Sequence, residues 1–379
     1  MFDGVVDRSY RKVSTSINRI RHQVNVTPSR TLQENTELEG KEIGEYIEKK
    51  AEKILKSMEF TTEGFPKNES VIRALRPATE FCPLPQEQVD EAIKKHGLYE
   101  QFQLEISQNP VIYEDPEKSV NISVDDVVVK EQKEKRPKKN QAEENHQKQE
   151  QEENPKEKHR HYVHNTIAHI EKGDSAYIVN GSRTVNVLRI VTAFLLFNGL
   201  CKYGLIFFTD GQKTLHSAIL KAFSWFMHVQ IILDWYHLED KCKKQLSMAL
   251  KGSIIRNHVV EKLTPWLWYG LVDKAIVLLQ NIDKESIKNQ KELDDLINYL
   301  IRVKPFIPVY EIRKRLGLRN SSNIGEKQND LIVSERQKHN GMSWSESGSV
   351  ALASITTVAR NNETQNWLEK GKINFKLAA

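Results

Sequence analysis

Cysteine is scarce in this chain, whose 379 residues include only Cys82, Cys201 and Cys242, all far apart. An odd and dispersed set predicts neither a disulfide framework nor a zinc knuckle, and it fits a reducing cytoplasm. An excess of one charge sign is also missing, because 56 basic residues face 51 acidic ones for a net charge of +5. Overall charge therefore indicates no class of partner, and any nucleic-acid contact must come from local patches.

Long hydrophobic runs are absent as well. The N-terminus, MFDGVVDR, has neither the basic start nor the apolar run of a signal peptide. The most apolar stretch, residues 185–200, is too short to cross a bilayer and contains Arg189. We expect it to form a buried helix in a protein without membrane contact, located in the cytoplasm near the nucleoid. The length allows two or three domains.

The segment SVNISVDDVVVKEQ, residues 119–132, has the β-branched composition of a strand that is apolar on both faces, yet Asp125 and Asp126 stand in its middle. Adjacent strand residues point to opposite faces, so at least one acid should face covered space. An unpaired buried carboxylate is costly and needs a partner, a proton or a metal ion. In the alternative interpretation, the strand ends at Asp125 and the pair begins a turn.

Residues 1–118 are predicted to be mostly helical. An amphipathic pattern covers residues 41–58, and a shorter one covers residues 86–95 and stops at Gly97. Upstream, DRSYRKVSTSINRIRHQ combines basic, hydroxyl and amide side chains that suit phosphate contact, although a solvated helix face has the same composition.

A highly charged segment follows the first strand. Residues 130–160 contain one hydrophobic residue, Ala142, so they cannot bury a core. We expect a disordered charged loop, inserted at a surface turn between strands.

Beyond this loop the pattern predicts strands in HYVHNTIAHIEKG, SAYIVNG, YGLIFFTDG and VQIILDW, with helices before and after the third of them. Three strands followed by helix, strand, helix and strand is the layout of the ribonuclease H-like fold, an α/β fold with a mixed sheet. The first part of this core would span residues 119–240, a helical insertion residues 241–320, and helices completing the core residues 321–379. Breaks in the helical pattern after Tyr236 are expected at four residues: Gly252, Pro265, Pro305 and Pro308.

Asp210 ends the strand LIFFT and precedes Gly211. An acid at this end of a strand lies at the rim where open α/β sheets bind ligands. An ordinary Asp-Gly turn that caps a helix is the alternative. In a ribonuclease H-like fold Asp125 would face Asp210. Two adjacent carboxylates repel, and a divalent cation relieves the repulsion; hard oxygen ligands select Mg²⁺ or Mn²⁺. A third acid is then expected on a later helix.

In this order, ISVDD, FFTDG, ILDWYHL and IGEKQNDLIVSERQKHNGMSW resemble the DDE-type transposases of bacterial insertion sequences. The specific group is one whose last acid precedes Arg-x-Lys-x-x-Gly-Met-x-Trp. That segment runs here from Arg336 to Trp344, and Glu326 stands ten residues before the arginine. The resemblance covers about residues 120–360. It implies that Asp125, Asp210 and Glu326 are catalytic and hold two Mg²⁺ or Mn²⁺ ions.

The resemblance also assigns a role to His237 in Asp234-Trp-Tyr-His237, either at the scissile phosphate or in support of the metal site; a structural Asp-His hydrogen bond is the alternative. Asp126 replaces the usual glycine of relatives, so the choice between Asp125 and Asp126 stays open. Asn323 with Glu326 three residues later is also a capping-box pattern.

The implied activity is metal-dependent cleavage of double-stranded DNA at element ends, followed by strand transfer into target DNA. Synapsis implies a homodimer or a larger assembly, with the N-terminal region and the insertion on the terminal inverted repeats. One candidate basic patch consists of Arg313, Lys314, Arg315 and Arg319, although a solvated helix end would have the same composition. The alternatives are a nuclease of the same fold without strand transfer and an inactive, transposase-derived DNA-binding protein.

Overall fold

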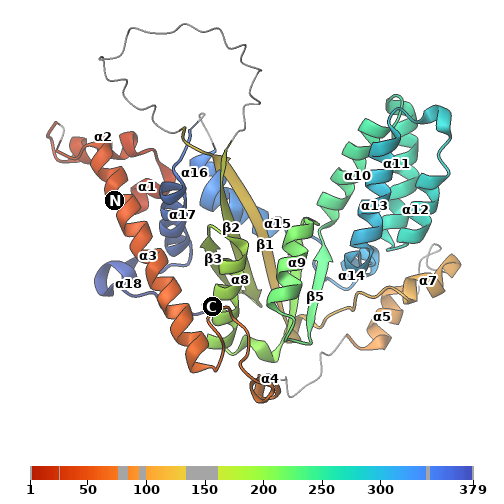
Figure 1. Ribbon diagram of the computed structural model, residues 1–379, viewed down its shortest axis with the longest axis horizontal. Helices are drawn as coiled ribbons and strands as arrows, with labels where there is room; N and C mark the ends of the chain where they lie inside the picture. The colour runs from red at the N-terminus through yellow and green to blue at the C-terminus, as the bar shows by residue number, and fades with distance from the viewer. Residues whose placement is uncertain are drawn as a thin grey trace, which may run out of the picture.

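The computed structural model describes residues 2–24, 26–75, 84–93, 100–133, 161–338 and 342–377. In these ranges the predicted α/β class is confirmed, because helices surround one five-stranded mixed sheet (Figure 1). The charged segment from residue 134 to 160, together with Cys82, Gly97 and Gly341, lies outside the described residues. The strands are β1 Ser119–Lys130, β2 Tyr162–Lys172, β3 Ser175–Gly181, β4 Gly204–Thr209 and β5 Val229–Leu233.

The strands lie in the order β3-β2-β1-β4-β5. β2 is antiparallel to both β1 and β3, whereas β1, β4 and β5 are parallel. β1 pairs with β2 through both acids, with Asp125 opposite Ile167, so the alternative of a turn at Asp125 is wrong. On its other side β1 pairs with β4 up to Ser123 and Phe208. The same register, continued by two residues, places Asp125 beside Asp210.

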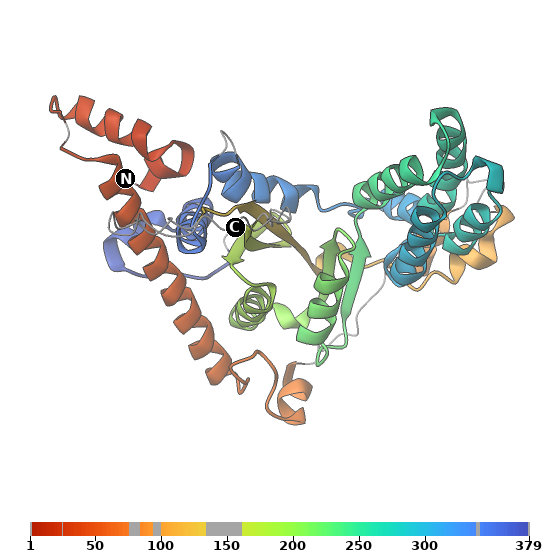
Figure 2. The same ribbon diagram turned by 45° about the horizontal axis from the view of Figure 1, so that its top comes forward.

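Helices cover both faces of the sheet (Figure 2). On one face lies α8, Thr184–Phe197, which is the buried helix expected at residues 185–200 and is followed by α9, Lys213–Ala222. On the other lie α17, Glu346–Arg360, and α15, Asn323–Asn329. No helix in the described ranges is long and apolar enough to span a membrane.

The described N-terminal residues are mostly helical, as expected. The long helix α3, Ser29–Ser57, begins twelve residues before the predicted start at residue 41. The amphipathic pattern did not reveal this first part, because it lacks an apolar stripe and packs on α17 through small residues. A Cβ at Gly40 would lie 2.2 Å from the Ala351 carbonyl oxygen, so the two helix backbones touch. The other elements in this region are α1 Phe2–Asp7, α2 Tyr10–Ile20, α4 Glu69–Leu75, α5 Gln86–Ile93, α7 Gln103–Ser107 and η1 Pro116–Lys118.

Helices after β5 form a lobe with its own hydrophobic core, on the opposite side of the sheet from α3 (Figure 1). The expected breaks at Gly252, Pro305 and Pro308 fall between its long helices, but the one expected at Pro265 is wrong. Pro265 lies in the last turn of its helix, where its missing N–H removes a single helical bond. The elements are α10 Trp235–Ala249, α11 Ser253–Trp268, α12 Val272–Gln280, η3 Lys284–Ser286, α13 Gln290–Val303, η4 Lys304–Phe306 and α14 Tyr310–Arg315.

The chain then returns to the sheet through α15. A π-helical segment, Asp330–Ser334, continues α15 into α16, Glu335–Gln337, and such segments are frequent at functional sites. The last described helix is α18, Thr364–Lys370, and the described chain continues to residue 377. A short 3-10 turn, η2 Leu200–Lys202, joins α8 to β4.

Candidate functional site

Asp125 lies on the face of β1 that α15 covers. Its Oδ2 accepts a hydrogen bond of 2.6 Å from Asn329 Nδ2, and its Oδ1 accepts one of 2.8 Å from the Asp126 backbone N–H. Burial, followed by the charge of the neighbouring Asp210 carboxylate, raises the pKa of Asp125 to about 6. These two acids are therefore close enough to repel each other.

Asp126 points to the opposite face of the sheet. Its carboxylate accepts hydrogen bonds from the hydroxyls of Thr166 on β2 and Thr184 at the start of α8. Because only Asp125 shares a face with Asp210 and Glu326, the geometry favours Asp125 as the first acid. Its catalytic role stays a prediction.

Asp210 stands at the end of β4 in a tight turn. Its Oδ1 accepts a 2.9 Å hydrogen bond from the Gln212 backbone N–H. Asp210 therefore lies at the rim of the sheet and also stabilises the turn that follows β4. Gly211 has a φ of +88°, and a Cβ there would lie 2.8 Å from both Leu233 Cδ1 and the Tyr299 hydroxyl. The insertion therefore packs directly on the turn that carries Asp210.

Glu326 is brought to the sheet by a very close approach of α15. A Cβ at Gly325 would lie 2.5 Å from Ser123 Cβ on β1, so only glycine allows this contact. The N-cap of α15 is Ser322, and no capping box forms between Asn323 and Glu326. Instead, Ser322 Oγ lies 3.2 Å from Glu326 Oε1 and 3.1 Å from Asp234 Oδ2, so its one hydroxyl proton is shared between the two carboxylates.

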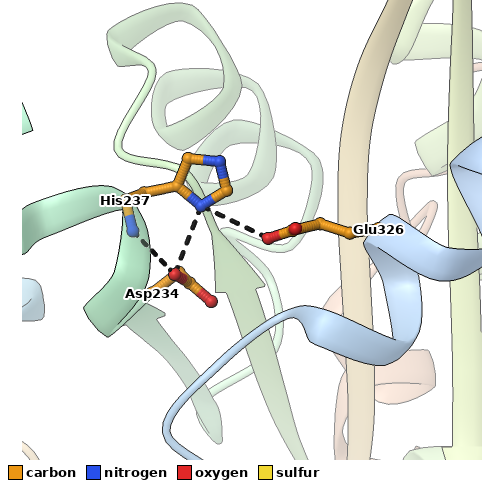
Figure 3. Close-up of side chains that lie close together, drawn as sticks. All are labelled: Asp234, His237 and Glu326. Atoms are coloured by element: carbon orange, nitrogen blue, oxygen red, sulfur yellow. Dashed lines mark hydrogen bonds and ion pairs between the residues drawn. The ribbon is translucent and has the colours of Figure 1, made fainter. Parts of the chain in front are cut away.

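His237 lies between two carboxylates, Asp234 and Glu326 (Figure 3). Its Nδ1 is 3.2 Å from Asp234 Oδ1 and 3.5 Å from Glu326 Oε1. The hydrogen bond with Asp234 outweighs the effect of burial, and together with the charges of Asp234 and Glu326 it raises the pKa of His237 to about 9. The imidazole is therefore protonated at neutral pH and offsets part of the negative charge of the site.

Asp234 is fully buried and acts as a structural anchor. Its Oδ1 caps α10 by accepting a 2.9 Å bond from the His237 backbone N–H, and its Oδ2 accepts bonds from the backbone N–H and hydroxyl of Ser322. Burial alone would raise its pKa, but the hydrogen bonds from His237 and Ser322 outweigh burial and lower it. Asp234 thus ties the start of α10 to the segment that leads into Glu326.

Two sets of side chains offer metal ligands in this region. Ligand atoms of Asp234, His237 and Glu326 lie within 4.8 Å of one another, but both Asp234 oxygens already accept hydrogen bonds. Asp125 and Asp210 lie outside that tight group, although Asp125 and Glu326 line one small cavity of about 10 Å³. An all-oxygen set of Asp125, Asp210 and Glu326 fits a hard divalent cation, because mutual repulsion of the acids is what such an ion relieves.

The four residues predicted from the sequence, on β1, just after β4, on α10 and on α15, thus lie in one region, but in the described part of the chain only Asp234, His237 and Glu326 have ligand atoms within 4.8 Å of one another. Sequence reasoning missed Asn329, Ser322 and Tyr299. Asn329 stands three residues after Glu326, a spacing that puts both on one helix face, and this signal was available in the sequence.

The predicted basic patch is wrong as a surface patch. Arg313 is completely buried and forms a bidentate ion pair with Glu114, with distances of 2.5 and 2.7 Å. Arg319 pairs with Glu171, and Arg315 pairs with Glu311 at 2.7 Å. Arg313 and Arg319 hold the insertion to the segment before β1 and to β2, whereas Arg315 pairs within α14 and is exposed, as is Lys314.

The Arg336 to Trp344 segment has a structural role. Arg336 is only 6% exposed, and its guanidinium lies 5.1 Å from the centre of the Tyr10 ring and 5.3 Å from that of Trp344. The Trp344 backbone donates a 2.9 Å bond to Lys130 and accepts a 2.8 Å bond from Gln132. The segment thus joins the N-terminal helices to the end of β1; its Gly341 is outside the described residues.

Comparison with known proteins adds no assignment. No protein-family model matches this chain, and neither a curated protein nor a solved structure matches it significantly.

Proposed function

We propose that this protein is a divalent-metal-dependent enzyme that cleaves and rejoins DNA phosphodiesters, of the DDE transposase type. The observation that carries the proposal is that Asp125 on β1 and Glu326 on α15 line one cavity, while Asp210, just after β4, is near enough for its charge to raise the pKa of Asp125. The strand order β3-β2-β1-β4-β5 and the parallel β1-β4 pair support a ribonuclease H-like core. The motifs that resemble insertion-sequence transposases support the choice of DNA as substrate.

Asp125, Asp210 and Glu326 would hold the metal through carboxylate oxygens, and Asn329 and Ser322 orient two of them. When bound, Mg²⁺ or Mn²⁺, as a pair of ions, activates a water or 3′-hydroxyl nucleophile and stabilises the leaving oxygen of an in-line displacement. The protonated imidazole of His237, beside Glu326, supplies a positive charge that attracts a phosphate. The partly buried site limits access of bulk water, which strengthens these charge interactions.

The proposed substrates are the terminal inverted repeats of an element and a target duplex, and pairing of two ends requires at least a dimer. Residues 1–118 and the helical insertion are the parts proposed to bind the element ends. Phosphate contacts by basic side chains would position the DNA without reading its sequence.

The test uses the purified protein, labelled DNA taken from the sequence that flanks its coding region, and Mg²⁺ or Mn²⁺. We expect cut and joined products from the unmodified protein and none from Asp210→Asn or Glu326→Gln. Asp126→Asn is the matched control, since that acid faces away from the site, and it should retain activity.

The other outcomes decide between the alternatives. Cut products without joined ones would favour a nuclease. An Asp210→Asn protein that stays folded and binds Mn²⁺ as tightly as the unmodified protein would favour a DNA-binding protein without catalysis.

A further inference from the structure

Helix α13 of the insertion lies against the turn that carries Asp210. A Cβ at Gly211 would lie 2.8 Å from the Tyr299 hydroxyl oxygen, so this side chain rests on the turn. The Arg302 guanidinium donates a 3.1 Å hydrogen bond to the Gly211 carbonyl oxygen. Tyr299 and Arg302 are three residues apart in α13 and therefore lie on one face of the helix. That face meets the backbone directly after Asp210.

The charge of Arg302 lies close to Asp210, but its hydrogen bond goes to a backbone carbonyl oxygen instead of the carboxylate. Burial and the charge of Arg302 lower the pKa of His216 to about 4, whereas the charge of Asp210 acts in the opposite direction, so both charged groups lie near this ring. An arginine paired with the carboxylate of Asp210 would occupy oxygens that a metal ion needs. Bonded to the next carbonyl, Arg302 holds the turn and does not occupy them.

Tyr299 encloses the turn and supports Arg302. The Arg302 guanidinium lies 5.3 Å from the centre of the Tyr299 ring, within the range of cation–π contact. Gly211, with a φ of +88°, is enclosed between the Tyr299 hydroxyl and Leu233 Cδ1, each 2.8 Å from the position of a Cβ. Within the residues that the structure describes, the buried Tyr299 hydroxyl oxygen has no hydrogen-bond partner, so packing of the ring, and not a bond of the hydroxyl, presses on the turn.

The residue before Asp210 is also held by contacts that lead to the insertion. The Thr209 hydroxyl lies 2.6 Å from His216 Nε2. The ring of His216 is 4.4 Å from that of Phe306, which belongs to η4 at the end of α13. Both neighbours of Asp210 in the chain are therefore fixed, directly or through one side chain, by the insertion.

We propose that Tyr299 and Arg302 are positioning residues that hold the Asp210 carboxylate toward Asp125, so that α13 controls metal binding at the acids. The inference rests on the proposed function. Groups that orient the ligands of a metal ion contribute strongly to its affinity, even though they do not touch the ion. By linkage, a partner that moves α13 changes the affinity for the metal, and the metal changes the affinity for that partner by the same factor.

The test measures Mn²⁺ affinity by calorimetry and, in a metal chelator, amide hydrogen exchange by mass spectrometry of peptides that contain Gln212. The Gln212 backbone N–H is bonded to Asp210 Oδ1, so its exchange reports on the turn without metal. We expect Arg302→Met to lower the Mn²⁺ affinity about ten- to a hundredfold and to accelerate exchange at Gln212. Arg302→Lys keeps a charged donor and should recover most of both losses.

The tyrosine variants separate the ring from its hydroxyl. Tyr299→Leu removes the ring that encloses Gly211 and should weaken Mn²⁺ binding, whereas Tyr299→Phe keeps the ring and should bind Mn²⁺ like the unmodified protein. Lys241→Met is the matched control. Lys241 is an exposed cation that lies 5.9 Å from the centre of the same ring but belongs to α10, so its loss should change neither measurement.

The outcomes separate this inference from the proposed function. Equal Mn²⁺ affinity in Arg302→Met and the unmodified protein would overturn the inference, and so would a lower free energy of unfolding as the sole effect, because the role would then be structural alone. Loss of Mn²⁺ binding in Asp210→Asn would in that case still support the proposed metal site. If the unmodified protein binds no Mn²⁺, the proposed function fails and control of metal binding fails with it, even where exchange at Gln212 shows that Arg302 holds the turn.

Discussion

Gly325 of α15 lies directly on Ser123 of β1, so close that a Cβ atom at position 325 would be 2.5 Å from Ser123 Cβ. This contact sets the distance between the helix that carries Glu326 and the strand that carries Asp125. It is the tightest requirement that the candidate site places on a single residue type.

Gly325→Ala should move α15 away from β1, because neither the α15 backbone nor the Ser123 Cβ can shift aside to make room for the added methyl group. We expect a loss of about 1–3 kcal/mol in the free energy of unfolding and weaker Mn²⁺ binding, measured by urea denaturation and calorimetry. The double variant Ser123→Gly/Gly325→Ala removes the clashing Cβ and should recover the Mn²⁺ affinity. An unchanged affinity in Gly325→Ala would contradict the role of this contact.

Asp125 should destabilise the metal-free protein when it is ionised. Its pKa is raised from 3.8 to about 6 in the fold, so the destabilisation is absent below pH 3.8 and complete above about pH 6. In a chelator at pH 8, Asp125→Asn should raise the free energy of unfolding by about 1–3 kcal/mol, with little difference near pH 4.

Added Mg²⁺ should then stabilise the unmodified protein but not Asp125→Asn, as thermal melts at pH 8 can measure. Asp126→Asn is the control and should keep the Mg²⁺ response, since Asp126 bonds to Thr166 and Thr184 on the other face. The idea fails if Asp125→Asn is the less stable protein at pH 8 without metal.

His237 should contribute stability of the opposite pH dependence. Its pKa is raised from 6.5 to about 9, so the contribution is fully present below pH 6.5 and is lost as the pH rises through 9. Allowing for solvent screening at this partly exposed ring, we expect about 1–2 kcal/mol. Urea denaturation in chelator at pH 6 and pH 10 should show this loss in the unmodified protein. A similar pH dependence in His237→Gln would refute the assignment.

The buried ion pair of Glu114 and Arg313 should be critical for attaching the insertion. Glu114→Gln leaves a fully buried guanidinium without its carboxylate and should lower the free energy of unfolding by about 3–5 kcal/mol. The double variant Glu114→Leu/Arg313→Met removes both charges and should recover most of that loss. Lys314→Met, at an exposed neighbour, should change stability by less than about 0.5 kcal/mol. Equal effects of Glu114→Gln and Lys314→Met would contradict this role.

Local pattern in the sequence determined the elements and their order. β-branched runs predicted the five strands, the apolar run at residues 185–200 predicted α8, and the positions of Gly252, Pro305 and Pro308 predicted ends of helices, because these signals depend only on neighbours along the chain. The predicted break at Pro265 was wrong, since a proline in the last turn of a helix removes only one helical hydrogen bond and does not end the helix there.

Only the tertiary structure decided which charged side chains face the site and which serve the fold. The sequence could not separate Asp125 from Asp126, because facing depends on which helix covers each side of β1. Nor could it show that Arg313 is buried, since its partner Glu114 is 199 residues away in the chain. A charge has the same chemistry in a site, on a surface or in a buried pair, and distant partners alone determine which of these it becomes.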